Sequence, residues 1–168
     1  QQEAKPEIDD VEAFFKKAIL AAHRQILRYA TEKHLMDTPR TTLVAAIVQG
    51  GGAGWMHCGD SRLYFVRQGE LLARTRDHSY IEQRQEAKPN VPIPDNFNRN
   101  VLYTCLGSPA KPVFEVTGPG PLQQGDRILL CSDGLWGSLD DSDIVYHLGH
   151  KPIGTSAPDL VEAALTKA

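Results

Sequence analysis

Four short segments rich in apolar and β-branched residues follow one another closely between Thr41 and Arg74. They are Thr41–Val48, Trp55–Cys58, Leu63–Arg67 and Leu71–Arg74, separated by Gly50–Gly54, Gly59-Asp60 and Gln68-Gly69-Glu70. Connections this short join antiparallel strands, whereas parallel strands need a crossover of a dozen residues or more. The sequence therefore predicts an antiparallel meander of four strands.

Helical patterns lie on both sides of these strands. Apolar residues recur with a three-four spacing from Val11 to Ala30, behind Asp9 and Asp10, which can cap the first turn. Shorter helices are expected over His78–Ala87, Asp141–Leu148 and Pro158–Lys167. Further strands are expected at Val101–Leu106, Val113–Val116 and Ile128–Cys131, and the last, continuously apolar, is expected to be buried on both faces. Runs of strands flanked by helices indicate an α+β fold rather than alternating βαβ units.

Composition limits the classes of protein to which the chain can belong. With 168 residues and 41% hydrophobic content, one domain over residues 1–168 is expected. The net charge is −3 and no basic stretch is dense enough to follow nucleic-acid phosphates, so no nucleic-acid partner is expected. No run of about twenty apolar residues and no secretory signal are present, so we expect a cytoplasmic protein with no membrane partner.

The three cysteines, Cys58, Cys105 and Cys131, have neither zinc-knuckle nor redox-pair spacing. Each lies within or at the end of an apolar stretch, so we expect reduced core residues.

Two polar runs mark the ends of apolar segments and are the places to look for function. These runs are Gly59-Asp60-Ser61-Arg62 and Cys131-Ser132-Asp133-Gly134. A carboxylate at the end of a strand is held rigidly and still reaches solvent and ligands. Taken singly, an Asp beside Gly at a strand end is usually a turn residue that accepts backbone hydrogen bonds. The spacing permits Asp60 and Asp133 to meet but does not require it.

The order of the motifs resembles that of the metal-dependent protein serine/threonine phosphatases of the protein phosphatase 2C type, the bacterial members above all. The matching segments are Thr41–Ala46, His57–Tyr64, Thr75–Ser79, Asn100–Leu102 with Leu106-Gly107, Gly125-Asp126 and Leu130–Trp136. This resemblance implies an α-β-β-α sandwich of two mainly antiparallel sheets flanked by helices, truncated relative to the family.

The resemblance also implies a site and a reaction. It makes Asp133 and Asp60 metal-binding and catalytic residues for Mg²⁺ or Mn²⁺, of which a complete family member holds two or three ions. Both are hard cations that prefer carboxylate and water oxygens. Two close metals can activate a bridging water for in-line attack on a phosphoserine or phosphothreonine ester. The expected partners are phosphorylated proteins, substrates of a serine/threonine kinase.

Parts of the family pattern are missing from this sequence. The family's phosphate-binding Arg, its Asp-Gly metal segment and a nearby His have no counterpart in residues 1–40, and a closing Asp-Asn run is absent before Ala168. The chain is therefore expected to be a piece of a longer enzyme, as Gln1 favours, or a degenerate member. As a piece it should have little activity alone. Sheet edges left unpaired could lead to a dimer.

The sequence alone leaves two other functions open. Loss of metal ligands would leave a non-catalytic, phosphatase-like binding or regulatory module. Gly59-Asp60-Ser61 also resembles the nucleophile motif of Gly-Asp-Ser-Leu esterases, but it follows a helix and a strand, and those enzymes place it after their first strand.

Several neighbouring residues receive structural interpretations. The loop Lys88–Arg99 lies where the family carries a variable flap, and it either sorts substrates or is a plain solvent loop. His78 is expected to cap or pack rather than act as a general acid, and Arg62 to pair with a carboxylate or hold the Gly-Asp turn. Trp55 and Trp136 are expected to contribute bulk to a core or an interface.

Overall fold

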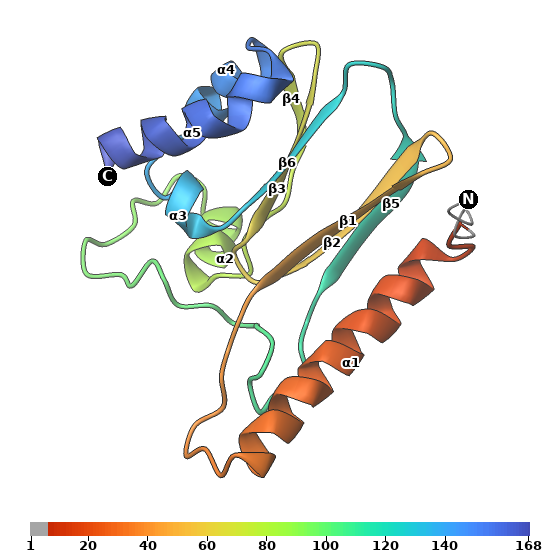
Figure 1. Cartoon of the computed structure of the whole chain (residues 1–168). Coiled ribbons are helices and arrows are strands. Elements are labelled where there is room, and N and C mark those ends of the chain that lie inside the picture. Colours follow the sequence, from red (N-terminus) through yellow and green to blue (C-terminus); the bar gives the residue numbers. More distant parts are fainter. Residues whose placement is uncertain (1–6) are drawn as a thin grey trace. The chain divides into compact units, whose positions relative to one another are not determined.

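The computed structural model describes residues 7–168. Its elements, labelled in Figure 1, are α1 (Val11–Glu32), β1 (Leu43–Gln49), β2 (Gly52–Cys58), β3 (Arg62–Arg67), β4 (Glu70–Arg74), α2 (Tyr80–Ala87), β5 (Glu115–Pro121), β6 (Arg127–Cys131), α3 (Asp133–Trp136), α4 (Asp141–Gly149) and α5 (Ile153–Lys167). The chain divides into two compact units. The first runs to Cys58 and includes Thr104–Leu122, and the second comprises Gly59–Tyr103 and Gln123–Ala168.

The first unit consists of α1 and an antiparallel sheet with the strand order β1-β2-β5. Figure 1 shows α1 running along this sheet. Val11, Phe15 and Ile19 form one buried stripe of the helix and pack with Met56 and Cys58 of β2. The three-four spacing seen in the sequence is therefore the face that α1 turns toward its sheet.

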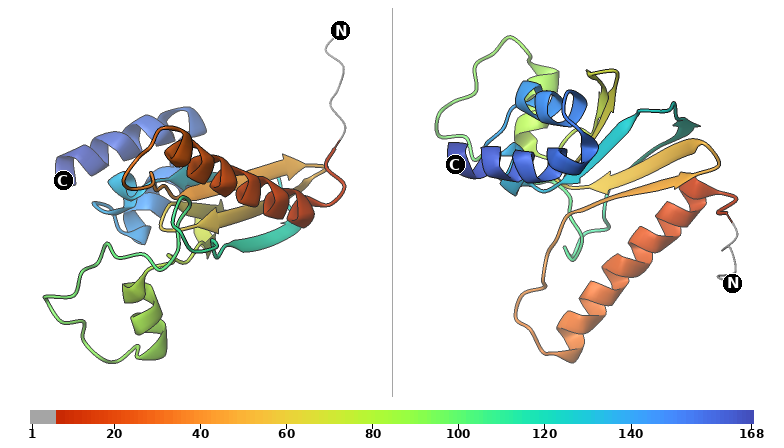
Figure 2. Two further views of the ribbon diagram at one scale, coloured as in Figure 1. Left: turned by 90° about the horizontal axis from the view of Figure 1, so that it is seen from below. Right: turned by 45° about the horizontal axis from the view of Figure 1, so that its top comes forward.

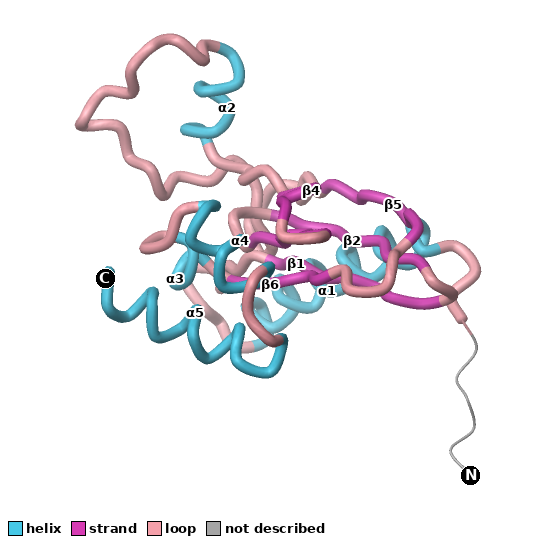
Figure 3. Tube along the Cα trace, turned by 90° about the horizontal axis from the view of Figure 1, so that it is seen from above, coloured by secondary structure: helices cyan, strands magenta, loops and turns pink. Residues whose placement is uncertain are grey.

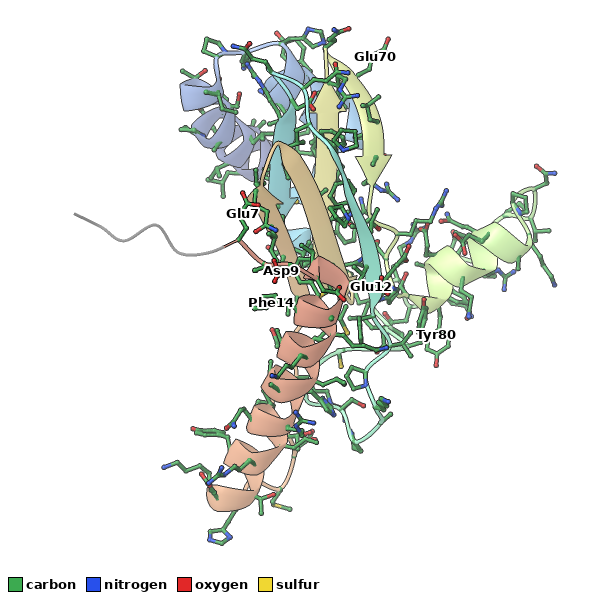
Figure 4. All side chains as sticks on the ribbon, turned by 90° about the vertical axis from the view of Figure 1, so that its right-hand side faces the viewer. Glu7, Asp9, Glu12, Phe14, Glu70 and Tyr80 are labelled. Atoms are coloured by element: carbon green, nitrogen blue, oxygen red, sulfur yellow. The ribbon has the colours of Figure 1, made fainter. Side chains whose placement is uncertain are left out.

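Local chemistry explains where α1 begins. The Asp10 side chain accepts a hydrogen bond from the Ala13 N–H at 2.9 Å, which makes Asp10 the N-cap. Glu12 adds an acidic side chain in the first turn, where it offsets the helix dipole. Figure 4 labels Asp9, Glu12 and Phe14 at this end of the helix, and Phe14 is exposed. The predicted first helix and its cap are confirmed.

The second unit contains an antiparallel sheet with the order β4-β3-β6 together with four helices. Tyr64 and Val66 of β3 are buried in a core with Ile144 and Leu148 of α4 and Leu160 of α5. Figure 2 shows α4 and α5 side by side. A capping box starts α4, in which Asp140 and Asp143 each accept a hydrogen bond from the other's backbone N–H.

The predicted α+β class with two antiparallel sheets is confirmed, but the predicted four-stranded meander is wrong. Hairpins β1–β2 and β3–β4 form as expected, whereas β2 and β3 pair in different sheets. Strand β2 also begins at Gly52, inside the glycine run assigned to a loop. Short spacing along the chain therefore gave the direction of the strands correctly and one of the pairings incorrectly.

Strand β6 was expected to be buried on both faces and is not. Leu130 is 41% exposed, and no residue of β6 is fully buried. The reason is its position at the edge of the β4-β3-β6 sheet. An apolar run of five residues does not distinguish a central strand from an edge strand.

The strand predicted at Val101–Leu106 is absent. Its backbone hydrogen bonds are divided between two partners, because the Tyr103 N–H donates to the His78 carbonyl and the Leu106 N–H to the Thr41 carbonyl. Only isolated bridges result. In Figure 3 the chain between α2 and this segment is a long loop, and nearly all its residues are exposed.

Two further boundaries differ from prediction. Strand β5 was expected at Val113–Val116 and lies at Glu115–Pro121; its prolines are tolerated because β5 is an edge strand. Helix α5 begins five residues before Pro158 because Ser156, Leu160 and Ala164 form a single buried stripe. The short helix α3 has no predicted counterpart.

The cysteines are free, as expected, although only Cys58 is fully buried. No helix among residues 7–168 combines the length and apolar character needed to cross a bilayer.

Substitution of Gly107 by Ala should destabilise the first unit strongly. Gly107 has a φ of 86°, and an added Cβ would overlap the carbonyl oxygen of Pro39 and crowd Ile26. Gly51→Ala is the matched control, because Gly51 also has a positive φ, 71°, but faces open space. The control should lose about 1–2 kcal/mol from left-handed strain alone, and Gly107→Ala should lose about 2 kcal/mol more, measured by urea unfolding. Equal losses would contradict the close approach.

The Arg67–Asp126 pair predicts a pH effect in the second unit. Two hydrogen bonds of 2.8 Å join the Arg67 guanidinium to the Asp126 carboxylate, and they lower the pKa of Asp126 from 3.8 to about 2. Because the folded pKa lies below the unfolded one, the stabilisation is complete above about pH 4 and is lost as the pH falls toward 2. Arg67→Met should return the pKa of Asp126 toward 3.8 in a carboxyl NMR titration. Arg24→Met, on an exposed position of α1, should leave it near 2.

Candidate metal and active site

Antiparallel pairing between β3 and β6 brings the two sequence motifs together. Arg62 pairs with Cys131 and Leu63 with Leu130. Asp60 and Asp133 each lie two residues beyond the Arg62–Cys131 pair, and Asp133 begins α3. Both motifs belong to the second unit, so its own strand pairing sets their relation. The charges of Asp60 and Asp133 interact in the folded chain, so the spacing that permits the two residues to meet is compatible with the structure.

The surroundings of Asp60 disfavour the ionised form of its carboxyl group. Burial, followed by the negative charges of Asp133 and Asp77, raises the pKa of Asp60 above its ordinary value. Asp60 is half-buried, whereas Asp133, the first residue of α3, is exposed. Two carboxylates, one half-buried beside other negative charges and one exposed to solvent, are a donor set that suits a hard divalent cation. These residues therefore fit Mg²⁺ or Mn²⁺.

Asp77 is not available as a ligand in the same way, because Arg62 occupies both of its oxygens. Arg62 Nε and Nη2 donate to the two Asp77 oxygens at 2.9 and 2.7 Å, and Arg62 Nη1 donates to the Tyr64 hydroxyl at 3.1 Å. Both charged side chains are buried. Burial alone would lower the pKa of Arg62, but the bonds to Asp77 and Tyr64 raise it above its ordinary value. The expectation that Arg62 pairs with a carboxylate is confirmed.

Gly59 and His78 fix the turn that precedes Asp60. The Gly59 N–H donates to His78 Nδ1 at 3.1 Å, and the His78 N–H donates to the Gly59 carbonyl at 2.9 Å. Gly59 has a φ of 108°, which a side chain would oppose. His78 is buried and holds this turn, in agreement with its predicted structural role.

Trp136 is the residue that the sequence interpretation undervalued. Its indole N–H donates to the backbone carbonyl of Asp60 at 2.9 Å, and the Arg62 guanidinium lies 3.6 Å from the centre of its ring. A signal was present in the sequence, because Trp136 follows Asp133 by three residues, a spacing that places two side chains on one face of a helical turn.

Cys131, next to Ser132-Asp133, is a poor candidate for a nucleophile. Burial raises the pKa of its thiol to about 11, although Arg62 lowers it in part. The thiol therefore stays protonated near neutral pH, and protonated thiols are weak nucleophiles. Chemistry at this site consequently depends on the carboxylates.

The comparison with known proteins agrees with the fold and the motifs. The sequence model of the protein phosphatase 2C family matches residues 1–167, and the chain belongs to this family. The Gly-Asp-Ser esterase alternative has no support from this match.

Similar proteins include two bacterial serine/threonine phosphatases. The chain is 30% identical to PstP of Mycobacterium tuberculosis over 159 residues, which cover 93% of this chain and 30% of PstP. It is 29% identical to the phosphatase stp of Listeria welshimeri, covering 95% of this chain and 63% of stp. The chain thus spans less than two thirds of these relatives.

Solved structures of a bacterial serine/threonine phosphatase have a fold similar to that of this chain. The crystal structure of the M. tuberculosis phosphatase PstP/Ppp superposes with a TM-score of 0.81 and 28% identity, covering 98% of this chain and 70% of that one. The catalytic domain of PstP in complex with two manganese ions has a TM-score of 0.79 and 27% identity, covering 97% of this chain and 68% of that one.

Removal of the Asp77 carboxylate should destabilise the second unit severely. Asp77→Ala leaves the Arg62 guanidinium buried without its partner, which typically costs about 3–5 kcal/mol. The exposed Arg28–Glu32 pair of α1, with an N–O distance of 2.8 Å, is the control, and Glu32→Ala should cost less than about 0.5 kcal/mol. Chemical denaturation measures both. A small effect at Asp77 would show that the buried pair does not stabilise this unit.

Proposed function

We propose that this chain acts as part of a metal-dependent serine/threonine protein phosphatase that hydrolyses phosphoserine and phosphothreonine esters. The observation that carries the proposal is that Asp60 and Asp133, each two residues beyond the last β3–β6 pair, interact through their charges, in a chain whose family match extends over residues 1–167. The named relatives are serine/threonine phosphatases, and one related catalytic domain holds two manganese ions.

Asp60 and Asp133 are the residues of this chain that would hold the metal. Bound Mg²⁺ or Mn²⁺ would supply an activated water and neutralise charge on the phosphoryl oxygens. Asp133 faces solvent, where a phosphate ester can approach, while half-burial keeps Asp60 in place. Arg62 is committed to Asp77 and Tyr64, so it is not assigned to the phosphate. No side chain is assigned a covalent role.

The proposal extends to the substrates, the location and the assembly of the protein. Phosphoproteins made by a serine/threonine kinase are the proposed substrates, and the exposed loop Lys88–Arg99 is the proposed place of contact with them. The proposed location is the cytoplasm, with which three free cysteines are consistent. We also propose that residues 1–168 function within one phosphatase domain, and that strands at sheet edges allow a dimer.

Calorimetry with Mn²⁺ and hydrolysis of a small aryl phosphate test the metal site. Asp133→Asn should weaken Mn²⁺ binding by about tenfold or more, because an amide replaces a charged ligand. Turnover by the chain should be weak, because two carboxylates leave most coordination positions to water, and it should require Mn²⁺. Asp9→Asn, at an exposed position near α1, should change neither quantity.

Two results would contradict this assignment. Undiminished Mn²⁺ binding by Asp133→Asn would place the ion elsewhere. Robust turnover that survives the same substitution would remove Asp133 from the reaction.

A further inference from the structure

We propose that Trp136 is a positioning residue that holds Asp60 facing Asp133. The inference concerns how the two carboxylates are kept together, and its consequence for metal binding rests on the proposed function. No contact of Trp136 with a substrate or a metal is proposed. It acts through the backbone of Asp60.

Repulsion between the Asp60 and Asp133 carboxylates opposes their close approach. The carboxylates of Asp60 and Asp133 carry like charges that repel each other. Asp60 and Asp133 lie beyond the last β3–β6 pair, Arg62 with Cys131, where the hydrogen-bonded ladder of the two strands no longer holds them. Without a bound cation, the two carboxylates would therefore tend to separate.

A hydrogen bond from Trp136 to the backbone of Asp60 opposes this separation. The Trp136 indole N–H donates to the Asp60 carbonyl at 2.9 Å. Trp136 is the last residue of α3 and Asp133 the first, so a single helical turn carries one carboxylate and holds the backbone of the other. Movement of Asp60 away from Asp133 would break this bond.

The indole ring of Trp136 is itself held in place by Arg62. The Arg62 guanidinium lies 3.6 Å from the ring centre and is fixed by its fork on Asp77, at 2.9 and 2.7 Å. Stacking of this kind stabilises the ring in one plane. Arg62 also begins β3, two residues after Asp60. The buried pair Arg62–Asp77 thus supports Trp136, and Trp136 supports Asp60.

The decisive variant is Trp136→Phe, which keeps an aromatic ring beneath Arg62 and removes the only hydrogen-bond donor of the side chain. In the metal-free chain, the backbone ¹⁵N order parameter of Asp60 should fall from about 0.85 to below about 0.6. Trp55→Phe is the matched control, because Trp55 is the other tryptophan of the chain and lies in β2. It should leave Asp60 ordered.

The metal arm uses Trp136 as a reporter. In Trp55→Phe, Trp136 is the remaining indole, and paramagnetic Mn²⁺ should quench its emission while Mg²⁺ should not. By calorimetry, Trp136→Phe should bind Mn²⁺ about tenfold more weakly than the wild type, the size of effect expected when an outer partner of a ligand is lost. Trp55→Phe should bind as the wild type does.

The outcomes separate this inference from the proposed function. An unchanged order parameter at Asp60 in Trp136→Phe overturns the inference, whether or not Mn²⁺ binds. A lowered order parameter in a chain whose wild type binds no Mn²⁺ supports the positioning role and counts against the metal site. If Trp136→Phe loses the native amide spectrum, the wild type decides: the Trp136 indole N–H should exchange slowly with solvent while it bonds the Asp60 carbonyl, and fast exchange would overturn the inference.

Discussion

The register of the antiparallel β3–β6 pair determines which residues lie at the candidate site. Because Arg62 lies opposite Cys131, Asp60 and Asp133 each follow two residues beyond the end of the pairing. A shift of one residue would turn every side chain of β6 to the opposite face and disrupt the core around Tyr64 and Val66. The packing that stabilises the second unit therefore also fixes which carboxylates meet.

The charges near Asp60 favour the proposed cation site over a structural ion pair. Three carboxylates, those of Asp60, Asp77 and Asp133, interact there with one buried guanidinium, that of Arg62. All three nitrogens of the Arg62 guanidinium donate to Asp77 and Tyr64, so its hydrogen bonds are not directed to Asp60 or Asp133. Sites that retain like charge at the expense of stability are commonly functional.

Local patterns in the sequence were sufficient for the local structure. The spacing of Val11, Phe15 and Ile19 gave α1, and the turn residues Gln68-Gly69 gave the β3–β4 hairpin. Assignment of Asp60 and Asp133 depended on the family resemblance, because an Asp-Gly pair by itself describes an ordinary turn. Pairing between distant segments was the part that periodicity could not supply. Gly59-Asp60 looked like a hairpin turn, although it connects strands of different sheets, and the role of Trp136 depends on a contact 76 residues away along the chain.

The prolines of β5 have a consequence for how the first unit meets other chains. Pro119 and Pro121 have no amide hydrogen, so the outer border of β5 offers an approaching strand fewer donors than its length would allow. Strand β1, at the opposite border, contains no proline along Leu43–Gln49. An extended segment that added to this sheet by backbone bonding would therefore find more donors along β1 than along β5.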